Sequence, residues 1–349
     1  MNYSVKCLLF LLSSCLLLNA CRKKQEDDGE ELKRSQAEAS TQWDGRTLFD
    51  DPSNPFLQPI PSSYQVHPNS AQMIDLIKSS CGNQFDNTYI VAKDYSTPVY
   101  IADENTGRAD IKITLYNMPS GKNYLQSVPL VKGSGAAAGG DMHYSVIDKS
   151  TGCLYEFWGF QNNKAYSGNA ISIHSNGIYA DGRGTVAAGW SQLLGVIWPS
   201  ELKNGLIDHA LTFTVSVTDK NGYVEPATHN DGTLSSNPYA IPEGTLIRIR
   251  PDINIDTISG IGNTERTVYK AIQKYGMYCG DTNGAGLGIR AINTQSLTTD
   301  AYPSDFTLTS THGTYVLKKF PFDWMEVVNA GPLKTNKGTY VEQSCASWR

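Results

Sequence analysis

The feature that most constrains the fold of this chain is a series of short segments in which apolar and polar residues alternate. Residues 110–116, 210–217 and 245–250 each divide their side chains between two faces in this way. The alternation matches the two-residue period of a half-buried β-strand. Many short strands separated by glycine and asparagine turns predict a mostly β domain, with a β-sandwich or jelly roll as the default architecture.

Two or three short helices are expected beside the strands. Residues 69–79 place Met73, Ile74 and Ile77 on one face, and residues 264–275 carry a second apolar stripe that ends at Gly276. Pro199 begins a possible helical turn. The remaining strands are expected at residues 89–92, 99–102, 143–148 and 153–160, and a glycine-rich loop at 130–141.

The N-terminus resembles that of bacterial lipoproteins. Lys6 precedes an apolar run from Cys7 to Leu18, which is a signal-peptide core too short to span a bilayer. The run ends in Leu-Asn-Ala-Cys, similar to the lipobox after which a lipoprotein is cut before its cysteine. The resemblance implies that residues 1–20 are removed and that Cys21 carries lipid and anchors the protein to a membrane. The alternative is ordinary secretion with cleavage near Ala20.

A charged segment follows the lipobox. Residues 21–45 are almost free of apolar side chains, so they are expected to form a flexible tether before a single domain at residues 46–349. The acidic stretch from Glu26 to Glu31 resembles the export signal of surface-exposed lipoproteins of Bacteroidetes, although three basic residues precede it. The expected location is the cell envelope, with the lipid in the outer membrane and surface exposure as a further possibility.

Charge and motif content exclude several classes of function. Removing the signal peptide deletes one lysine and no acid, so the net charge changes from −5 to −6. Nonspecific nucleic-acid binding needs a basic face, and no nucleic-acid partner is expected. The sequence contains no Walker A loop, GxGxxG fingerprint, GxSxG elbow or HExxH motif. No cofactor and no metal site are therefore predicted.

Four of the seven cysteines belong to the expected domain: Cys81, Cys153, Cys279 and Cys345. In an oxidising compartment they predict at least one disulfide, with three pairings open for two bonds. No two of them have the CxxC spacing of a zinc–thiolate site.

Four internal phrases resemble those of a family of secreted bacterial proteins. Relatives carry a similar Asp-x-His strand, Cys-x-Leu-Tyr-Glu strand, Ile-x-His-Ala-Leu strand and Tyr-Gly-Met segment. The phrases are DMHYSVIDKSTGCLYEFW (141–158), LLGVIWPSEL (193–202), IDHALTFTV (207–215) and QKYGMYCGD (273–281). The resemblance covers about residues 55–330 and implies one domain, but no mechanism. Trp198 stands where the relatives tend to have arginine.

The segment from Asp141 to Trp158 is the strongest candidate site. A four-residue turn ending in Gly152 pairs Asp148 with Cys153 and puts Asp141, His143, Glu156 and Trp158 on one face; a three-residue turn separates them. The first register predicts a concave sugar site in which Glu156 is the proton donor and Trp158 stacks on the ring. The alternative is that these are polar groups satisfied within a sheet.

Further candidates are weaker individually. His209 is a candidate general base or metal ligand, and Asp281 is a candidate second acid. The alternatives are that His209 is a histidine hydrogen-bonded within the fold and that Asp281 caps a turn. The aromatic residues of 144–198 are expected to be mostly core, with Tyr144 and Trp190 as candidate saccharide contacts.

Together these features favour an envelope-anchored lipoprotein that binds a polysaccharide and is a candidate hydrolase or lyase. A non-catalytic glycan-binding or adhesive lipoprotein is the alternative, because it needs the aromatic residues but not the acids. A structural envelope protein without a small ligand is the third reading. The expected partners are thus a polysaccharide or cell-surface glycan and the membrane.

Overall fold

The computed structural model describes residues 43–82, 87–115, 121–284, 286–297, 302–309, 312–336, 338, 341 and 343–349. The predicted signal peptide, Cys21 and nearly all of the predicted tether lie outside these residues. Within the described part of the chain, no helix is both long and apolar enough to cross a membrane.

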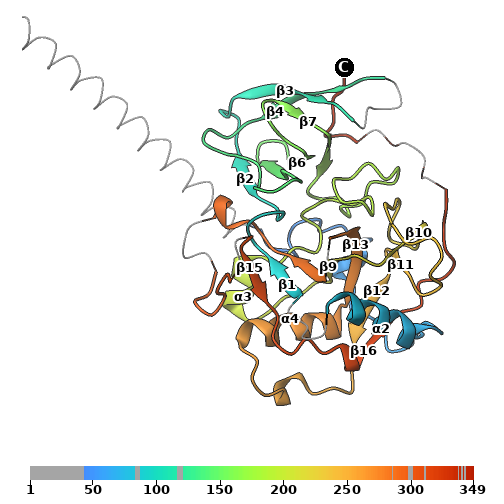
Figure 1. Cartoon of the computed structure of the whole chain (residues 1–349). Helices are drawn as coiled ribbons and strands as arrows, with labels where there is room; N and C mark the ends of the chain where they lie inside the picture. Colours follow the sequence, from blue (N-terminus) through green and yellow to red (C-terminus); the bar gives the residue numbers. More distant parts are fainter. Residues whose placement is uncertain are drawn as a thin grey trace, which may run out of the picture.

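A mixed seven-stranded sheet forms the centre of the molecule (Figure 1), with the strand order β15-β1-β14-β9-β13-β12-β16. β1 runs parallel to β14 and β13 runs parallel to β9, whereas the other neighbouring strands are antiparallel. The strands are β1 (Thr88–Val91), β9 (Leu211–Val215), β12 (Leu246–Ile249), β13 (Met277–Thr282), β14 (Leu287–Arg290), β15 (Thr314–Val316) and β16 (Met325–Val327).

Three helices pack against one face of this sheet: α2 (Ser70–Ser80), α3 (Pro199–Asn204) and α4 (Asn263–Lys274). The predicted stripe of α2 is confirmed, since Met73, Ile74 and Ile77 are buried. α4 starts one residue earlier than expected, because the Glu265 carboxylate accepts a hydrogen bond from the Gly262 N–H at 2.8 Å. Short 3₁₀ turns lie at Pro55–Leu57, Ile255–Thr257, Thr294–Ser296 and Phe322–Trp324.

The opposite face of the sheet is covered by a four-stranded sheet with the order β2-β5-β6-β8. A three-stranded sheet, β4-β3-β7, packs on the far side of that sheet, and β10 pairs with β11 separately. These strands are β2 (Val99–Ala102), β3 (Arg108–Ile113), β4 (Tyr124–Pro129), β5 (Tyr144–Asp148), β6 (Cys153–Trp158), β7 (Lys164–Ala165), β8 (Ser167–Ser172), β10 (Thr218–Tyr223) and β11 (Ile241–Glu243). The predicted mostly β, sandwich-like fold with three helices is confirmed.

The β5–β6 hairpin adopts the four-residue register. Asp148 pairs with Cys153 and Ser145 pairs with Glu156. Gly152 ends the turn with a φ of +66°, a conformation that glycine adopts without strain. Alternation then sends Ile147 and Leu154 towards the seven-stranded sheet, and Val146 and Phe157 towards the three-stranded sheet.

The packed part of the chain begins earlier than the expected boundary at residue 46. Trp43, Leu48 and Phe49 are buried in the core between the two large sheets. Gly45 lies against the His209 ring, where a Cβ atom would come within 1.9 Å of Nε2, so only glycine fits there. Residues 43–45 therefore belong to the domain and not to a flexible tether.

The predicted disulfide is confirmed. Cys153 of β6 is bonded to Cys345, 192 residues further along the chain, while Cys81 and Cys279 are free and buried. The bond holds the C-terminal segment on the three-stranded sheet, where Trp348 is buried and bridges to Leu125.

Replacing Cys345 by serine is expected to lower the free energy of unfolding by about 3–5 kcal/mol, because the bond closes a long loop in the unfolded chain. Urea titration of the oxidised protein measures this loss. Wild type treated with dithiothreitol should match Cys345→Ser, and Cys81→Ala, which removes a free thiol, should lose much less. A variant as stable as the oxidised wild type would contradict the prediction.

Candidate functional site

Asp141, His143 and Trp158 meet at the end of the β5–β6 hairpin opposite its turn, where β5 begins and β6 ends. The Trp158 Nε1–H donates to Asp141 Oδ1 at 3.2 Å, and Asp141 Oδ2 lies 3.9 Å from His143 Nε2. Met142 has a φ of +42°, so Asp141 precedes the strand and does not continue it. Asp141 is close to His143 and Trp158, as predicted, because the chain bends at Met142. The positive φ of this bend is rare for a residue other than glycine.

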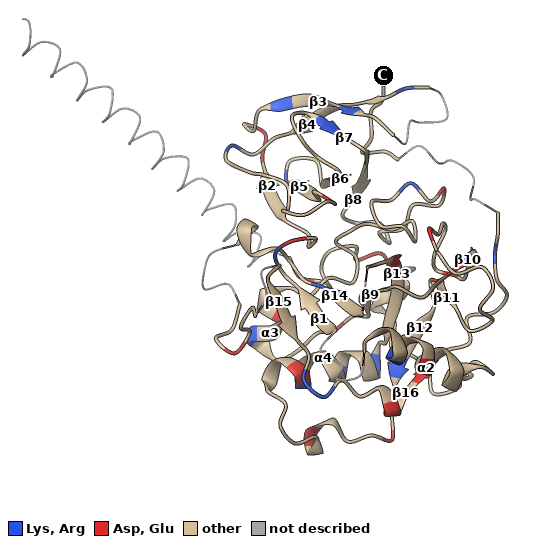
Figure 2. Ribbon diagram, viewed as in Figure 1, with Lys and Arg blue, Asp and Glu red and all other residues tan. Residues whose placement is uncertain are grey.

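The central sheet contributes Asp281 and Arg290 to the same region. A bulge between Cys279 and Asp281 lets Tyr278 pair with Thr212 and Asp281 with Thr214, so both side chains face the four-stranded sheet. Arg290 Nη2 donates to Asp281 Oδ2 at 2.8 Å. Figure 2 shows the acidic segment at the end of β13 and scattered basic residues elsewhere on the ribbon.

Burial changes the protonation of these groups. It raises the pKa of Asp281 to about 7, with Asp231 and Asp141 adding to the rise and Arg290 opposing it. Burial and the positive charge of Arg290 lower the pKa of His143 to about 4. At neutral pH the His143 imidazole is thus neutral, and the Asp281 carboxyl has a pKa close to the ambient pH, so it can readily gain or lose a proton.

Two buried donors or acceptors of this cluster have no hydrogen-bond partner among the described residues. They are His143 Nδ1 and Arg290 Nη1, in side chains that are 2% and 5% exposed. Buried polar groups are nearly always hydrogen-bonded, so these two unpaired atoms are unusual. Both are covered by protein, so in this arrangement neither reaches a bound ligand.

Glu156 lies on the same face as His143 but is enclosed. Its carboxylate accepts hydrogen bonds from Ser191 Oγ at 2.6 Å and from the Gln192 N–H at 3.1 Å, and its exposed fraction is zero. Burial raises its pKa to about 7 despite these hydrogen bonds. The carboxyl cannot touch a bound glycan in this arrangement, so its predicted role as proton donor needs correction.

The aromatic contacts also differ from the expectation. Tyr144 and Trp190 are 1% and 0% exposed and pack within the core, so neither ring can serve as a sugar platform. Trp158 is partly exposed and meets the 36%-exposed Tyr166 edge to face, with ring centroids 5.1 Å apart. Gly159 allows this contact, because a Cβ there would lie 2.1 Å from the Tyr166 ring.

His209 lies apart from the cluster and has a structural environment. Its Nδ1 faces the Ala210 carbonyl at 2.7 Å and its Nε2 faces Glu201 Oε1 at 2.9 Å. A doubly protonated ring donates to both acceptors. Burial alone would lower the pKa of His209, but the Glu201 carboxylate reverses this effect and the pKa is raised. A fully buried ring whose two nitrogen atoms both face protein acceptors does not fit the predicted general base.

Replacing His209 by glutamine is expected to cost about 3–5 kcal/mol of stability, because it leaves Glu201 buried without its charged partner. The folded-state pKa lies above the unfolded value, so this contribution is full below about pH 6.5 and is lost as pH rises through the folded pKa. Urea titrations from pH 5.5 to 9 should show the difference from wild type shrinking. His174→Gln, on an exposed ring, is the matched control; a constant difference would contradict the pairing.

Sequence reasoning missed Arg290, Gln192 and Tyr166. The sequence could have indicated Arg290, because a cation at the end of the apolar strand Leu-Gly-Ile-Arg is expected to be buried and therefore to need a charged partner. Gln192 binds the Tyr144 carbonyl and Ser145 Oγ at 2.9 and 2.6 Å, and thus fixes the hairpin beneath His143. Nothing in the sequence distinguishes Tyr166 from the surrounding buried aromatic residues.

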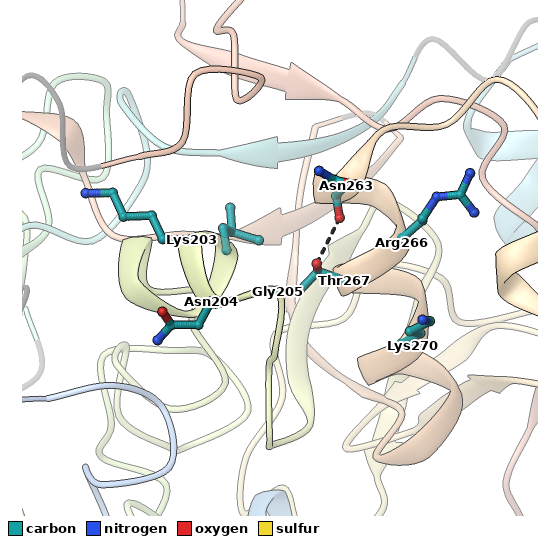
Figure 3. A pocket seen from close by; sticks show the side chains of 8 residues that line it. Lys203, Asn204, Gly205, Asn263, Arg266, Thr267 and Lys270 are labelled. Atoms are coloured by element: carbon teal, nitrogen blue, oxygen red, sulfur yellow. Dashed lines mark hydrogen bonds between the residues drawn. The ribbon is translucent and has the colours of Figure 1, made fainter.

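Two cavities lie away from this cluster. One, of about 280 Å³, lies between α3 and α4 (Figure 3). Two of its three cations already have partners: Arg266 donates to the Ile255 and Asp256 carbonyls, and Lys270 pairs with Asp256 at 2.8 Å. The other, of about 650 Å³, lies beside β13. Among the described residues, no group of three or more His, Cys, Asp and Glu side chains is arranged to hold a metal ion.

Comparisons with models of known protein families, with curated proteins and with solved structures find no match to the chain. The functional argument therefore depends on the chemistry of the site.

Proposed function

We propose that the protein is an envelope lipoprotein, anchored through Cys21, that binds a polysaccharide at Asp141, Trp158 and Tyr166 and cleaves it. One observation carries the proposal. The partly exposed Asp141 carboxylate contacts Trp158 and His143 and interacts electrostatically with Asp281, whose pKa is raised to about 7. Two acids in different environments beside an exposed indole are what glycoside hydrolysis requires.

Binding uses the aromatic pair. The indole of Trp158 presents an apolar surface on which the C–H face of a sugar ring can pack, and Tyr166 extends that surface. The exposed Asp141 carboxyl supplies an acceptor for hydroxyl groups. The combination of flat apolar surface and polar groups favours a saccharide over a purely apolar ligand.

Cleavage assigns the two acids different roles. Protonated Asp281 donates its proton to the glycosidic oxygen as the bond from that oxygen to the anomeric carbon breaks. Ionised Asp141 takes a proton from the attacking water, which becomes the new anomeric hydroxyl. The Trp158 indole N–H, which donates to Asp141, orients that carboxyl, and Arg290 stabilises Asp281 after it loses its proton. Asp281 thus takes the donor role expected of Glu156.

The purified mature domain should be screened on neutral and acidic polysaccharides, with reducing ends and the absorbance of unsaturated sugars as readouts. Reducing ends alone indicate a hydrolase, and both signals together indicate a lyase. Trp158→Ala should weaken polysaccharide binding at least tenfold, about 1.4 kcal/mol, because the stacking surface is lost. Trp324→Ala, on the helical side of the molecule, is the matched control. Equal binding by both variants would remove the proposed site.

A non-catalytic glycan-binding lipoprotein is the second candidate. The observation in its favour is the 2.8 Å contact between Arg290 and Asp281, which is also suited to a purely structural ion pair. Binding that depends on Trp158 without any product would support this candidate.

A further inference from the structure

A cavity lies on the same side of the central sheet as Asp281. The cavity of about 650 Å³ beside β13 is lined by Tyr278, Tyr223, Pro226, Pro55, Asn176 and Thr228, among others. Its volume falls within the range of roughly 300–1,000 Å³ found for sites that hold drug-sized ligands, which includes a disaccharide. Neither Asp141 nor Asp281 lines it, so the proposed cleavage does not use it.

Tyr278 gives this cavity an unpartnered polar group. Its ring is fixed by Phe56, with centroids 4.6 Å apart, and by Trp190 at 6.5 Å. Its residue is 9% exposed, and its hydroxyl makes no hydrogen bond to any residue that the structure describes. The hydroxyl is not enclosed by protein and its residue lines the cavity, so it is available to hydrogen-bond a ligand there.

The rest of the lining selects for a neutral ligand. Glu225 and Lys334 form an ion pair with each other, so their charges compensate. The Tyr223 hydroxyl donates to the Asn336 carbonyl, which leaves the ring to provide apolar surface. Pro55 and Pro226 add further apolar surface, while Asn176 and Thr228 add neutral polar groups. Apolar faces alternating with neutral hydrogen-bonding groups match a sugar, and they match neither an anion nor a hydrocarbon chain.

The cavity and the acid pair are close along one strand. Tyr278 and Asp281 share a face of β13 and are three residues apart, roughly 10 Å. The loop that contains Ala188 crosses between them, because the Ala188 N–H donates to the Gly280 carbonyl at 2.9 Å. The two positions are thus neighbouring but separate.

We infer that this cavity is a second saccharide site, which binds a neutral disaccharide unit through the Tyr278 hydroxyl. The inference rests on the proposed function only in taking a glycan as the ligand. It specifies that the glycan contains neutral sugar units and that the protein holds it at two places on the same face.

The probes are cellobiose, maltose, laminaribiose and mannobiose, with digalacturonate as the charged comparison, each titrated calorimetrically into the mature domain. We expect at least one neutral disaccharide to bind and digalacturonate not to bind. Tyr278→Phe keeps the ring and should weaken binding about tenfold, since one hydrogen bond is lost. Ala180→Trp fills the cavity from an exposed position and should abolish binding without changing the melting temperature.

Trp158→Ala separates this inference from the proposed function. Disaccharide binding that survives Trp158→Ala and is lost in Ala180→Trp supports the second site, even if no polysaccharide is cleaved. Binding that is unaffected by Tyr278→Phe and Ala180→Trp overturns it, even if cleavage occurs. Absence of binding by all four neutral disaccharides at millimolar concentration also overturns the inference. Binding of neutral peptides by a protein that binds none of the disaccharides overturns it as well.

Discussion

Asp281→Asn and Asp141→Asn are each expected to lower turnover of the polysaccharide by about 10²–10⁴-fold while leaving its binding nearly unchanged. The reason is that each substitution removes one partner in proton transfer, and a positioned acid or base contributes about this factor. The Trp158 and Tyr166 rings, which carry most of the binding surface, remain in place. Single-turnover rates and equilibrium binding measured on the same preparations separate the two effects.

The pH dependence gives an independent check of the Asp281 assignment. Asp281 must be protonated to donate, and its pKa is raised to about 7, so the rate should decline as pH rises through this value. The same decline should be absent from the residual rate of Asp281→Asn. A wild-type rate that is flat from pH 6 to 8.5 would exclude Asp281 as the proton donor.

Two control variants and one stability measurement keep the interpretation specific. Asp252→Asn removes an exposed carboxylate paired with Arg250 and should leave turnover unchanged. Melting temperatures are needed for Asp281→Asn, because its charge compensates the buried Arg290. Glu156→Gln should retain turnover, since the enclosed carboxylate does not reach the substrate. Full loss of activity in Glu156→Gln alone would return the donor role to Glu156.

Cys21→Ser is expected to move essentially all of the protein from the membrane fraction to the soluble fraction. The reason is that serine cannot form the thioether that carries the lipid. Fractionation with an antibody to the domain measures the change, and labelled palmitate should enter wild type only. Cys7→Ser and Cys15→Ser, in the expected signal peptide, are controls that should remain membrane-bound. A Cys21→Ser variant that stays in the membrane, with unlabelled wild type, would disprove the anchor.

The structure locates the elements that local pattern could predict. The stripe of Met73, Ile74 and Ile77 specifies α2, and the alternation in residues 210–217 specifies β9, because each repeat is a property of neighbouring residues. The hairpin register was also predictable, since Gly152 supplies the positive φ that a four-residue turn needs. These features gave Asp141, His143 and Trp158 as one group.

The sequence predicted which side of a strand a side chain occupies much better than it predicted whether that side chain is buried. The alternation of β6 sends Glu156 and Trp158 to the same side, but it does not say what covers them. The loop containing Ser191 and Gln192 encloses Glu156, whereas Trp158 at the strand end stays partly exposed. Tyr144 and Trp190 became core for the same reason, because neighbouring layers cover them.

The sequence by itself determined the three helices, the β5–β6 turn, the expectation of at least one disulfide and the positions of seven strands, which are β1, β2, β3, β5, β6, β9 and β12. These features follow from residues close together in the chain or from cysteine number. Only the tertiary structure decided that Cys345 is the partner of Cys153, and that Asp281 and Arg290 face the hairpin. The bulge at Gly280 turns Asp281 towards the hairpin, and that turn depends on strand pairing with β9. Contacts between residues more than a hundred positions apart depend on how the sheets and helices stack. The periodicity of apolar and polar residues within one segment contains no information about that stacking.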